Sequence, residues 1–162
     1  YPAFFCSLKK LFLSGDFFEI KRQNESDPTA AEIRDQTLIE AIKTTVAKGD
    51  TAAASGNQTE ALAHYRTALA RLEKDFLNIS SYDIRFGISL VAPRIAETYA
   101  QTNDPRTLPA FERLNLWSTC GLMASVGTKP YQDRLRELGL TRMPRTDGTE
   151  CADALTFALF RD

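Results

Sequence analysis

Apolar and small residues recur at every third or fourth position along most of this chain, with polar residues between them. Such spacing is typical of amphipathic helices, which turn one face to the protein core and the other to water. The pattern predicts helices over about residues 28–55, 58–76, 83–102, 105–120 and 130–139. In the third of these helices the predicted buried face consists of Ile84, Ile88, Val91, Ile95 and Tyr99.

Turn-forming residues mark the ends of these helices. Asp27 can cap the first helix and Pro28 can occupy its first turn. Gly56 and the residue after it form a turn, and Gly139 is placed to end the helix before it. Pro93 lies inside the third helix and lacks a backbone donor, so we expect a kink or a break at about residues 90–92.

Residues 42–76 carry the most specific pattern in the chain. Gly49 lies in the middle of a helix, where glycine costs about 1 kcal/mol relative to alanine, so its presence indicates close packing. Ala61, Tyr65 and Ala68 share one face of the next helix. We expect Gly49 and Ala68 to let two helices approach closely, while Tyr65 fills the space between them.

This helical hairpin resembles a single tetratricopeptide repeat, a unit of about 34 residues. Thr45, Lys48 and Glu73 depart from the residues that the repeat usually has at those positions. A second, degenerate hairpin is expected at residues 84–125. The matching positions are Gly49, Ala53, Gly56, Asn57, Glu60, Ala61, Tyr65, Ala68 and Leu69.

The fold predicted from these observations is all-α, a short right-handed stack of tetratricopeptide-like helical hairpins. An amphipathic arm is expected over residues 1–24, the hairpins over 27–126 and C-terminal capping helices over 129–162. Residues 17–20 fit a short strand or an extended arm, and residues 155–160 fit a helix better than a strand.

The resemblance also implies a site. In tetratricopeptide-like proteins the first helices of successive hairpins line a groove that holds a peptide or a partner segment. By this resemblance Lys43, Ala47, Asp50 and Ala54 form the partner-binding groove. We therefore expect a non-catalytic protein-interaction domain, one sensing or assembly module of a longer regulatory protein.

Candidate chemistry is sparse. His64 is the single histidine, so neither a histidine relay nor a histidine metal site can be built, and we expect no cofactor or metal. Two alternatives remain. One is an enzyme or an enzyme's accessory domain with a small-molecule pocket near Trp117, Tyr131 and Cys120. The other is a membrane-proximal domain that contacts lipid through residues 1–24, where Phe4 to Phe12 form an apolar stripe.

Composition narrows the classes of partner. The chain has 162 residues, enough for one domain, and its formal net charge of −1 gives no reason to expect nucleic acid. Its three cysteines, an odd number, favour unpaired buried thiols in a reducing compartment such as the cytoplasm. The first residue is Tyr1, so we expect a processed product or part of a longer protein. A homodimer is a further possibility.

Overall fold

The computed structural model describes residues 29–75, 81–123, 127–139 and 157–161. These residues form helices and no strand, which confirms the all-α prediction. The predicted arm at residues 1–24, including the ambiguous residues 17–20, lies outside the described residues. The same holds for residues 155 and 156, whereas the structure places Ala158–Arg161 in a helix, α8.

The first described helix, α3, is Ala30–Ala54. Its N-terminus is closed by a capping box, in which Glu32 N–H donates to Thr29 Oγ1 at 3.2 Å and Thr29 N–H donates to Glu32 Oε2 at 2.6 Å. The capping residue is therefore Thr29 and not Asp27 as the sequence suggested. The helix is continuous for 25 residues.

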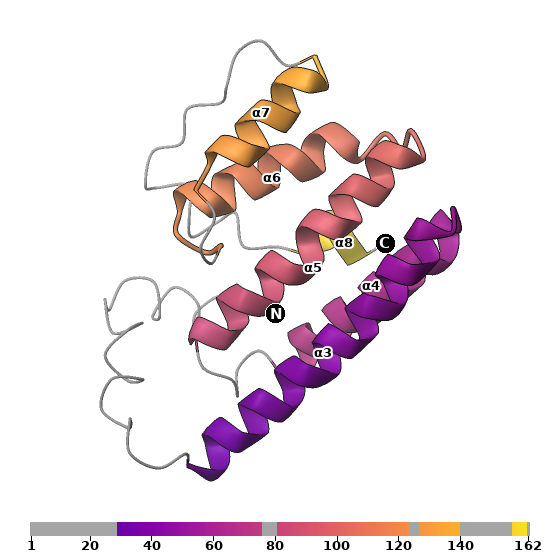
Figure 1. Cartoon of the computed structure of the whole chain (residues 1–162). Coiled ribbons are helices and arrows are strands. Elements are labelled where there is room, and N and C mark those ends of the chain that lie inside the picture. Colours follow the sequence, from indigo (N-terminus) through magenta and orange to yellow (C-terminus); the bar gives the residue numbers. More distant parts are fainter. Residues whose placement is uncertain (1–28, 76–80, 124–126, 140–156, 162) are drawn as a thin grey trace.

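The second helix, α4, is Gln58–Asp75 and forms a hairpin with α3. Gly56 has a φ of +84°, a left-handed conformation that glycine adopts without steric cost, so the predicted turn is confirmed. Asn57 then caps α4 by accepting a hydrogen bond from the Glu60 N–H at 3.1 Å. Figure 1 shows the two helices running side by side.

Three further helices follow: α5 is Ser81–Gln101, α6 is Thr107–Thr119 and α7 is Lys129–Glu137. Each packs on the one before it, and α3 also packs on α5 (Figure 1). Helix α5 runs unbroken through Pro93, so the expected break is absent. Gly139 follows α7 with a φ of +95°, as its predicted role in ending the helix requires.

The core lies along the inner faces of these helices. Tyr65, Ala61 and Ala68 of α4 are almost completely buried, as predicted, and Trp117 of α6 is fully buried. The stripe predicted on α5 is buried in full, from Ile84 to Tyr99. Periodicity therefore identified the inward faces correctly.

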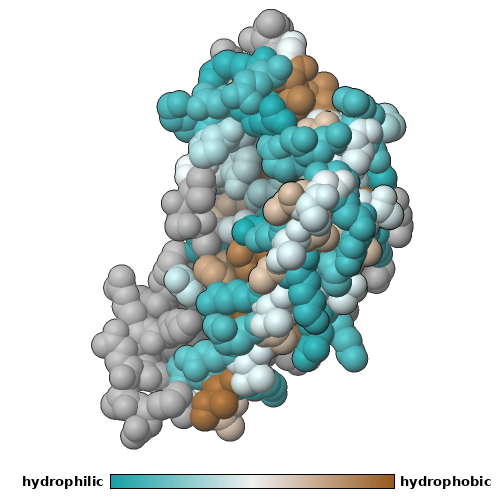
Figure 2. Space-filling model, turned by 45° about the vertical axis from the view of Figure 1, so that its right-hand side comes forward, coloured by the Kyte–Doolittle hydropathy of each residue, from teal (hydrophilic) through white to brown (hydrophobic). Residues whose placement is uncertain are grey.

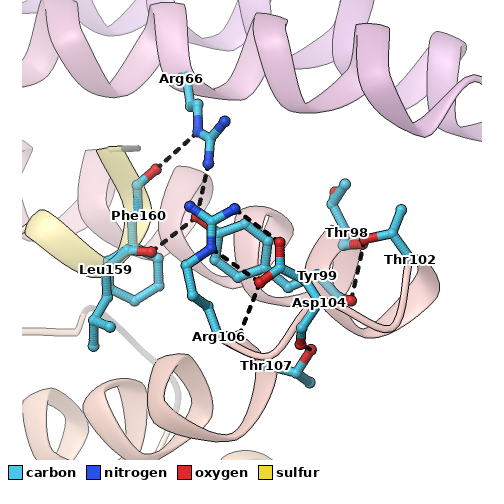
Figure 3. Close-up of polar contacts among 9 residues, drawn as sticks. All are labelled: Arg66, Thr98, Tyr99, Thr102, Asp104, Arg106, Thr107, Leu159 and Phe160. Atoms are coloured by element: carbon cyan, nitrogen blue, oxygen red, sulfur yellow. Dashed lines mark hydrogen bonds and ion pairs between the residues drawn. The ribbon is translucent and has the colours of Figure 1, made fainter.

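The short helix α8 returns to the middle of the stack, where it contacts α4, α5 and α6. Phe160 is fully buried, with its ring centroid 5.2 Å from that of Trp117. Two side chains hold the α8 backbone (Figure 3): Arg66 Nε donates to the Phe160 carbonyl at 3.3 Å, and the Tyr99 hydroxyl donates to the Leu159 carbonyl at 2.8 Å. Polar contacts thus fix the backbone of α8 over the core.

Candidate protein-interaction face

The four residues predicted to form a groove lie on one stripe of α3. Lys43, Ala47, Asp50 and Ala54 are spaced by four, three and four positions, which places them on the same side of the helix, and all four are exposed. Lys43 and Asp50 contact α5, and α5 in turn contacts α7, as described below. We call the surface that these helices share the α3–α5–α7 face.

Lys43 joins α3 to α5 through an aromatic ring. Its ammonium nitrogen lies 5.4 Å from the centroid of Phe86, within the range of a cation–π contact. The same nitrogen donates to Glu40 Oε1 at 2.9 Å. Lys43 therefore contacts a neighbour on its own helix and an aromatic ring of α5.

Asp50 is the most highly connected residue of the predicted groove. It accepts a hydrogen bond from the Tyr65 hydroxyl at 2.7 Å. It also receives two bonds from Arg94 of α5, from Nε at 2.9 Å and from Nη2 at 3.2 Å. Arg94 in addition donates to the Leu90 carbonyl at 2.7 Å. Asp50 therefore joins three helices while its side chain remains 46% exposed.

These contacts change the acidity of both partners. Burial alone would raise the pKa of Asp50, but the hydrogen bonds from Arg94 and Tyr65 and the charge of Arg94 hold it below its ordinary value. Burial and the bond to Asp50 raise the pKa of Tyr65 well above its ordinary value. At neutral pH the face therefore carries an ionised Asp50 beside a neutral phenol.

A second ion pair joins α5 to α7. Arg134 donates to both oxygens of Glu97, from Nε at 2.9 Å and from Nη2 at 3.1 Å. It also donates to Glu137 Oε2 at 3.0 Å, and its guanidinium carbon lies 5.7 Å from the centroid of Phe111. The hydrogen bond to Glu97 raises the pKa of Arg134 above its ordinary value, so Arg134 stays charged.

A pocket of about 200 Å³ lies beside this second ion pair. Phe111 and Tyr131, both buried, provide aromatic surface, and Glu97, Asp133 and Glu137 provide carboxylates against the single arginine Arg134. Lys129 and Arg136 also bind Asp133, at 2.6 Å and 3.0 Å, but neither lines the pocket. The complete lining is Pro93, Glu97, Phe111, Pro130, Tyr131, Asp133, Arg134 and Glu137.

Sequence reasoning missed most of the residues that α5, α6 and α7 contribute to this face and its pocket, with the exception of Tyr131, which was named for the alternative pocket. From the sequence alone, Phe86 and Phe111 cannot be distinguished from ordinary core residues, and the charges around Arg134 fit a solvated ion-pair surface. The charged residues at spacings of three and four on α7 were the one available signal, but they do not identify Glu97 as a partner.

The alternative pocket is not assembled as the sequence suggested. Tyr131 does line a pocket, but Trp117 is fully buried against Phe157 and Phe160, and neither Trp117 nor Cys120 lines that pocket. Cys120 is disulfide-bonded, so the expectation that it is an unpaired thiol is wrong. His64 lies on α4 with Nε2 3.7 Å from Glu60 Oε1.

Figure 2 shows the molecule turned by 45° from Figure 1, so that the side at right there comes forward. In this view the strongly hydrophobic residues form separate groups among hydrophilic and intermediate ones. The residues coloured by hydropathy show no continuous apolar patch. Within the described ranges no group of three or more His, Cys, Asp or Glu residues is placed to hold a metal ion. No helix in that part of the chain is long and apolar enough to cross a membrane.

No family model, curated protein or solved structure matches this chain.

Proposed function

We propose that this chain is a non-catalytic, tetratricopeptide-like interaction domain whose α3–α5–α7 face binds an extended segment of another protein. The observation that carries the proposal is the pair of salt bridges on the exposed α3–α5–α7 face. Asp50–Arg94 joins α3 to α5, and Glu97–Arg134 joins α5 to α7. Together they present fixed polar groups along three helices, next to a pocket that can take a side chain.

The order of helix packing supports the tetratricopeptide-like part of the proposal. Helices α3 and α4 form one hairpin, α5 and α6 follow as the next pair, and the first helices of the two pairs contact each other. In a stack of such hairpins the first helices line the binding surface. Two of the residues that the resemblance assigned to the groove, Lys43 and Asp50, contact α5.

Preorganisation supports a binding role for the face. Lys43, Asp50 and Arg94 are already held by neighbours, so a bound segment would not have to immobilise them and less side-chain entropy would be lost. Ala47, between Lys43 and Asp50, and Ala54, one turn beyond Asp50, are exposed and small, which leaves room for the main chain of a peptide.

The pocket supports a specific anchor, a lysine or arginine side chain of the bound segment. Three carboxylates, Glu97, Asp133 and Glu137, line it, and its apolar wall includes Phe111 and Tyr131. Arg134 illustrates how such a site holds a guanidinium, with carboxylates at its edge and the Phe111 ring nearby. A basic side chain from a partner would meet the same groups.

Selection from a random peptide display library tests the binding face. The full chain is the bait, and the selected peptides are then measured against Ala47→Arg and Ala63→Arg. Both alanines are exposed, but Ala63 lies on α4, outside the proposed face. We expect binding to fall at least tenfold with Ala47→Arg and to persist with Ala63→Arg. Failure to select any peptide, or equal loss with both variants, would contradict the proposal.

The anchor is tested by two changes on α7 that alter the net charge equally. Glu137→Gln removes one carboxylate from the pocket, whereas Gln132→Lys adds one positive charge to a residue that does not line it. We expect the first to weaken the selected peptides severalfold and the second to have little effect. If the peptides lack a shared basic residue, or if the two variants behave alike, the pocket does not hold a basic anchor.

A further inference from the structure

Three of the five asparagines in this chain stand two residues before a serine or threonine with no proline between. These triplets are Asn24-Glu25-Ser26, Asn57-Gln58-Thr59 and Asn78-Ile79-Ser80. The pattern Asn-x-Ser/Thr is the acceptor motif for N-linked glycosylation, and it occurs on the surface of secreted proteins. Asn57 lies within the described residues, so its surroundings can be tested against that role.

Asn57 has the exposure and backbone setting of an acceptor. It lies in the turn between α3 and α4, directly after Gly56 with its positive φ, and both Asn57 and Thr59 are exposed. This turn is at the end of the hairpin, at right in Figure 1. We propose that Asn57 is N-glycosylated and that the chain passes through an oxidising secretory compartment, which goes beyond the proposed binding function.

The existing contacts of Asn57 leave the reacting atom usable. Its Oδ1 accepts from the Glu60 N–H at 3.1 Å, and its Nδ2 donates one hydrogen to Glu60 Oε2 at 2.7 Å. A side-chain amide has two N–H groups, so a second hydrogen on Nδ2 is available. After modification the amide keeps its carbonyl and one N–H, so the cap on α4 is retained.

In the proposed modification, an oligosaccharide is transferred to Asn57 from a lipid carrier, which is the second substrate. Nδ2 of Asn57 attacks the anomeric carbon of an oligosaccharide carried on a polyprenyl diphosphate. A carbon–nitrogen bond forms, the bond from that carbon to the diphosphate oxygen breaks, and the lipid diphosphate leaves. Nδ2 gives up one proton, and no oxidant or reductant is consumed.

The disulfide at Cys120 independently supports passage through an oxidising compartment. Cys120 is disulfide-bonded, and structural disulfides persist in oxidising environments but are rare where glutathione keeps thiols reduced. The other cysteines, Cys6 and Cys151, lie outside the described residues. The disulfide therefore favours an oxidising compartment over the cytoplasmic location that the odd number of cysteines suggested.

The glycan would also leave the proposed binding pocket open. Asn57 lies three residues beyond Ala54, the last residue of the α3 stripe, whereas the pocket is formed by α5, α6 and α7. Glycosylation and peptide binding can therefore be tested separately.

The first experiment uses the protein isolated from its natural source. It is treated with an endoglycosidase that converts glycosylated asparagine to aspartate, in water enriched in oxygen-18, and digested with trypsin. We expect the peptide covering residues 49–66 to carry labelled aspartate at position 57 only after that treatment. Recovery of this peptide solely with an unmodified Asn57 would overturn the proposal, whether or not the other two triplets are modified.

The second experiment expresses the full chain through the secretory pathway of eukaryotic cells and compares glycosidase-sensitive gel mobility. Thr59→Ala should remove one glycan, Thr59→Ser should retain it, and Thr67→Ala, an exposed threonine outside any triplet, should have no effect. Because none of these changes touches the core, loss of folding does not obscure the result. Identical mobility of Thr59→Ala and the parent chain would refute modification at Asn57.

Discussion

Tyr65 of α4 lies directly against the backbone of Gly49 in α3. A β-carbon on Gly49 would overlap Cε1 of the tyrosine ring and lie 2.8 Å from its Cδ1. The hydroxyl of the same ring donates to Asp50, the next residue of α3, at 2.7 Å. One side chain thus fills the space that the missing β-carbon leaves and also fixes the first charged residue beyond it.

This contact predicts that Gly49→Ala destabilises the protein. In an exposed helix the change would stabilise by about 1 kcal/mol through helix propensity. Here the ring has to move, so we expect the free energy of unfolding to fall by about 1–3 kcal/mol. Urea unfolding followed by circular dichroism measures the difference.

Two further variants separate packing from propensity. Ala47→Gly, two residues earlier on the exposed side of α3, reports the propensity cost alone. In a Tyr65→Ala background, Gly49→Ala should no longer destabilise, because the clashing ring is gone. An equal loss from Gly49→Ala in both backgrounds would show that the ring is not the cause.

Ala61 and Ala68 of α4 are both buried, but we expect their substitution by leucine to reduce the stability of the protein by different amounts. Ala61 is fully buried, and Ala68 is nearly so but lines a groove of about 300 Å³ between α3 and α4. We expect Ala61→Leu to destabilise by about 1–3 kcal/mol, and Ala68→Leu by less, because its longer side chain can enter the groove. Thermal melting of the two variants compares them, and equal melting temperatures for both variants and the parent chain would contradict close packing at Ala61.

The hairpin could be predicted from the sequence because its decisive contact is encoded locally. Gly49 and Tyr65 are 16 positions apart on two helices joined by a short turn, so periodicity fixes which faces meet. The same argument correctly placed the buried stripe of α5, where each apolar residue lies one helical turn from the next.

The charged part of the face could not be predicted in this way. Asp50 and Arg94 are 44 positions apart, and Glu97 and Arg134 are 37 apart. Periodicity assigns such residues to an exposed face, but their pairing depends on how successive helices are offset and on the rotamers of long side chains. Arg66 meets the Phe160 carbonyl across 94 positions, and nothing in the local sequence encodes that contact.

The bridge between Asp50 and Arg94 predicts a modest, salt-dependent contribution to stability. Asp50→Ala leaves the Tyr65 hydroxyl and Arg94 without this acceptor, and because the carboxylate is 46% exposed we expect a loss of only about 1 kcal/mol. Asp50→Asn keeps an oxygen for Tyr65 and should cost less. A double-mutant cycle with Arg94→Met, measured by urea unfolding at low and high salt, isolates the ion pair. A coupling energy of zero at low salt would contradict the bridge.

The disulfide at Cys120 predicts that reductant weakens the fold. Cross-links of this kind typically contribute about 2–4 kcal/mol, so dithiothreitol should lower the urea midpoint of the parent chain. Cys120→Ser should match the reduced parent and respond no further to reductant. Titration of thiols in unfolded, unreduced protein should find fewer than the three cysteines of the sequence. Finding all three reactive would contradict the bond.

Asp104, in the turn between α5 and α6, should make the stability of the fold depend on pH in the acid range. Arg106 donates to its carboxylate from Nε at 2.9 Å, from Nη2 at 2.8 Å and from its backbone N–H at 2.8 Å (Figure 3). The hydrogen bonds from Arg106 lower the pKa of Asp104 from 3.8 to about 2. Because this pKa is lower in the folded state, the stabilisation is complete above about pH 4 and is lost as the pH falls through about 2.

Asp104→Asn isolates this contribution from other acidic groups, such as Asp50, whose pKa is also lowered. The amide still accepts from the Arg106 backbone, so the turn is kept, but it cannot ionise. We expect the parent chain to lose roughly 1–2 kcal/mol more than the variant between pH 5 and pH 2, measured as urea midpoints. Arg106→Gln should remove most but not all of the acid sensitivity, because its backbone N–H still donates to Asp104, and it should add nothing further in the Asp104→Asn background. If Arg106→Gln keeps the acid sensitivity of the parent chain, the lowered pKa does not arise from this arginine.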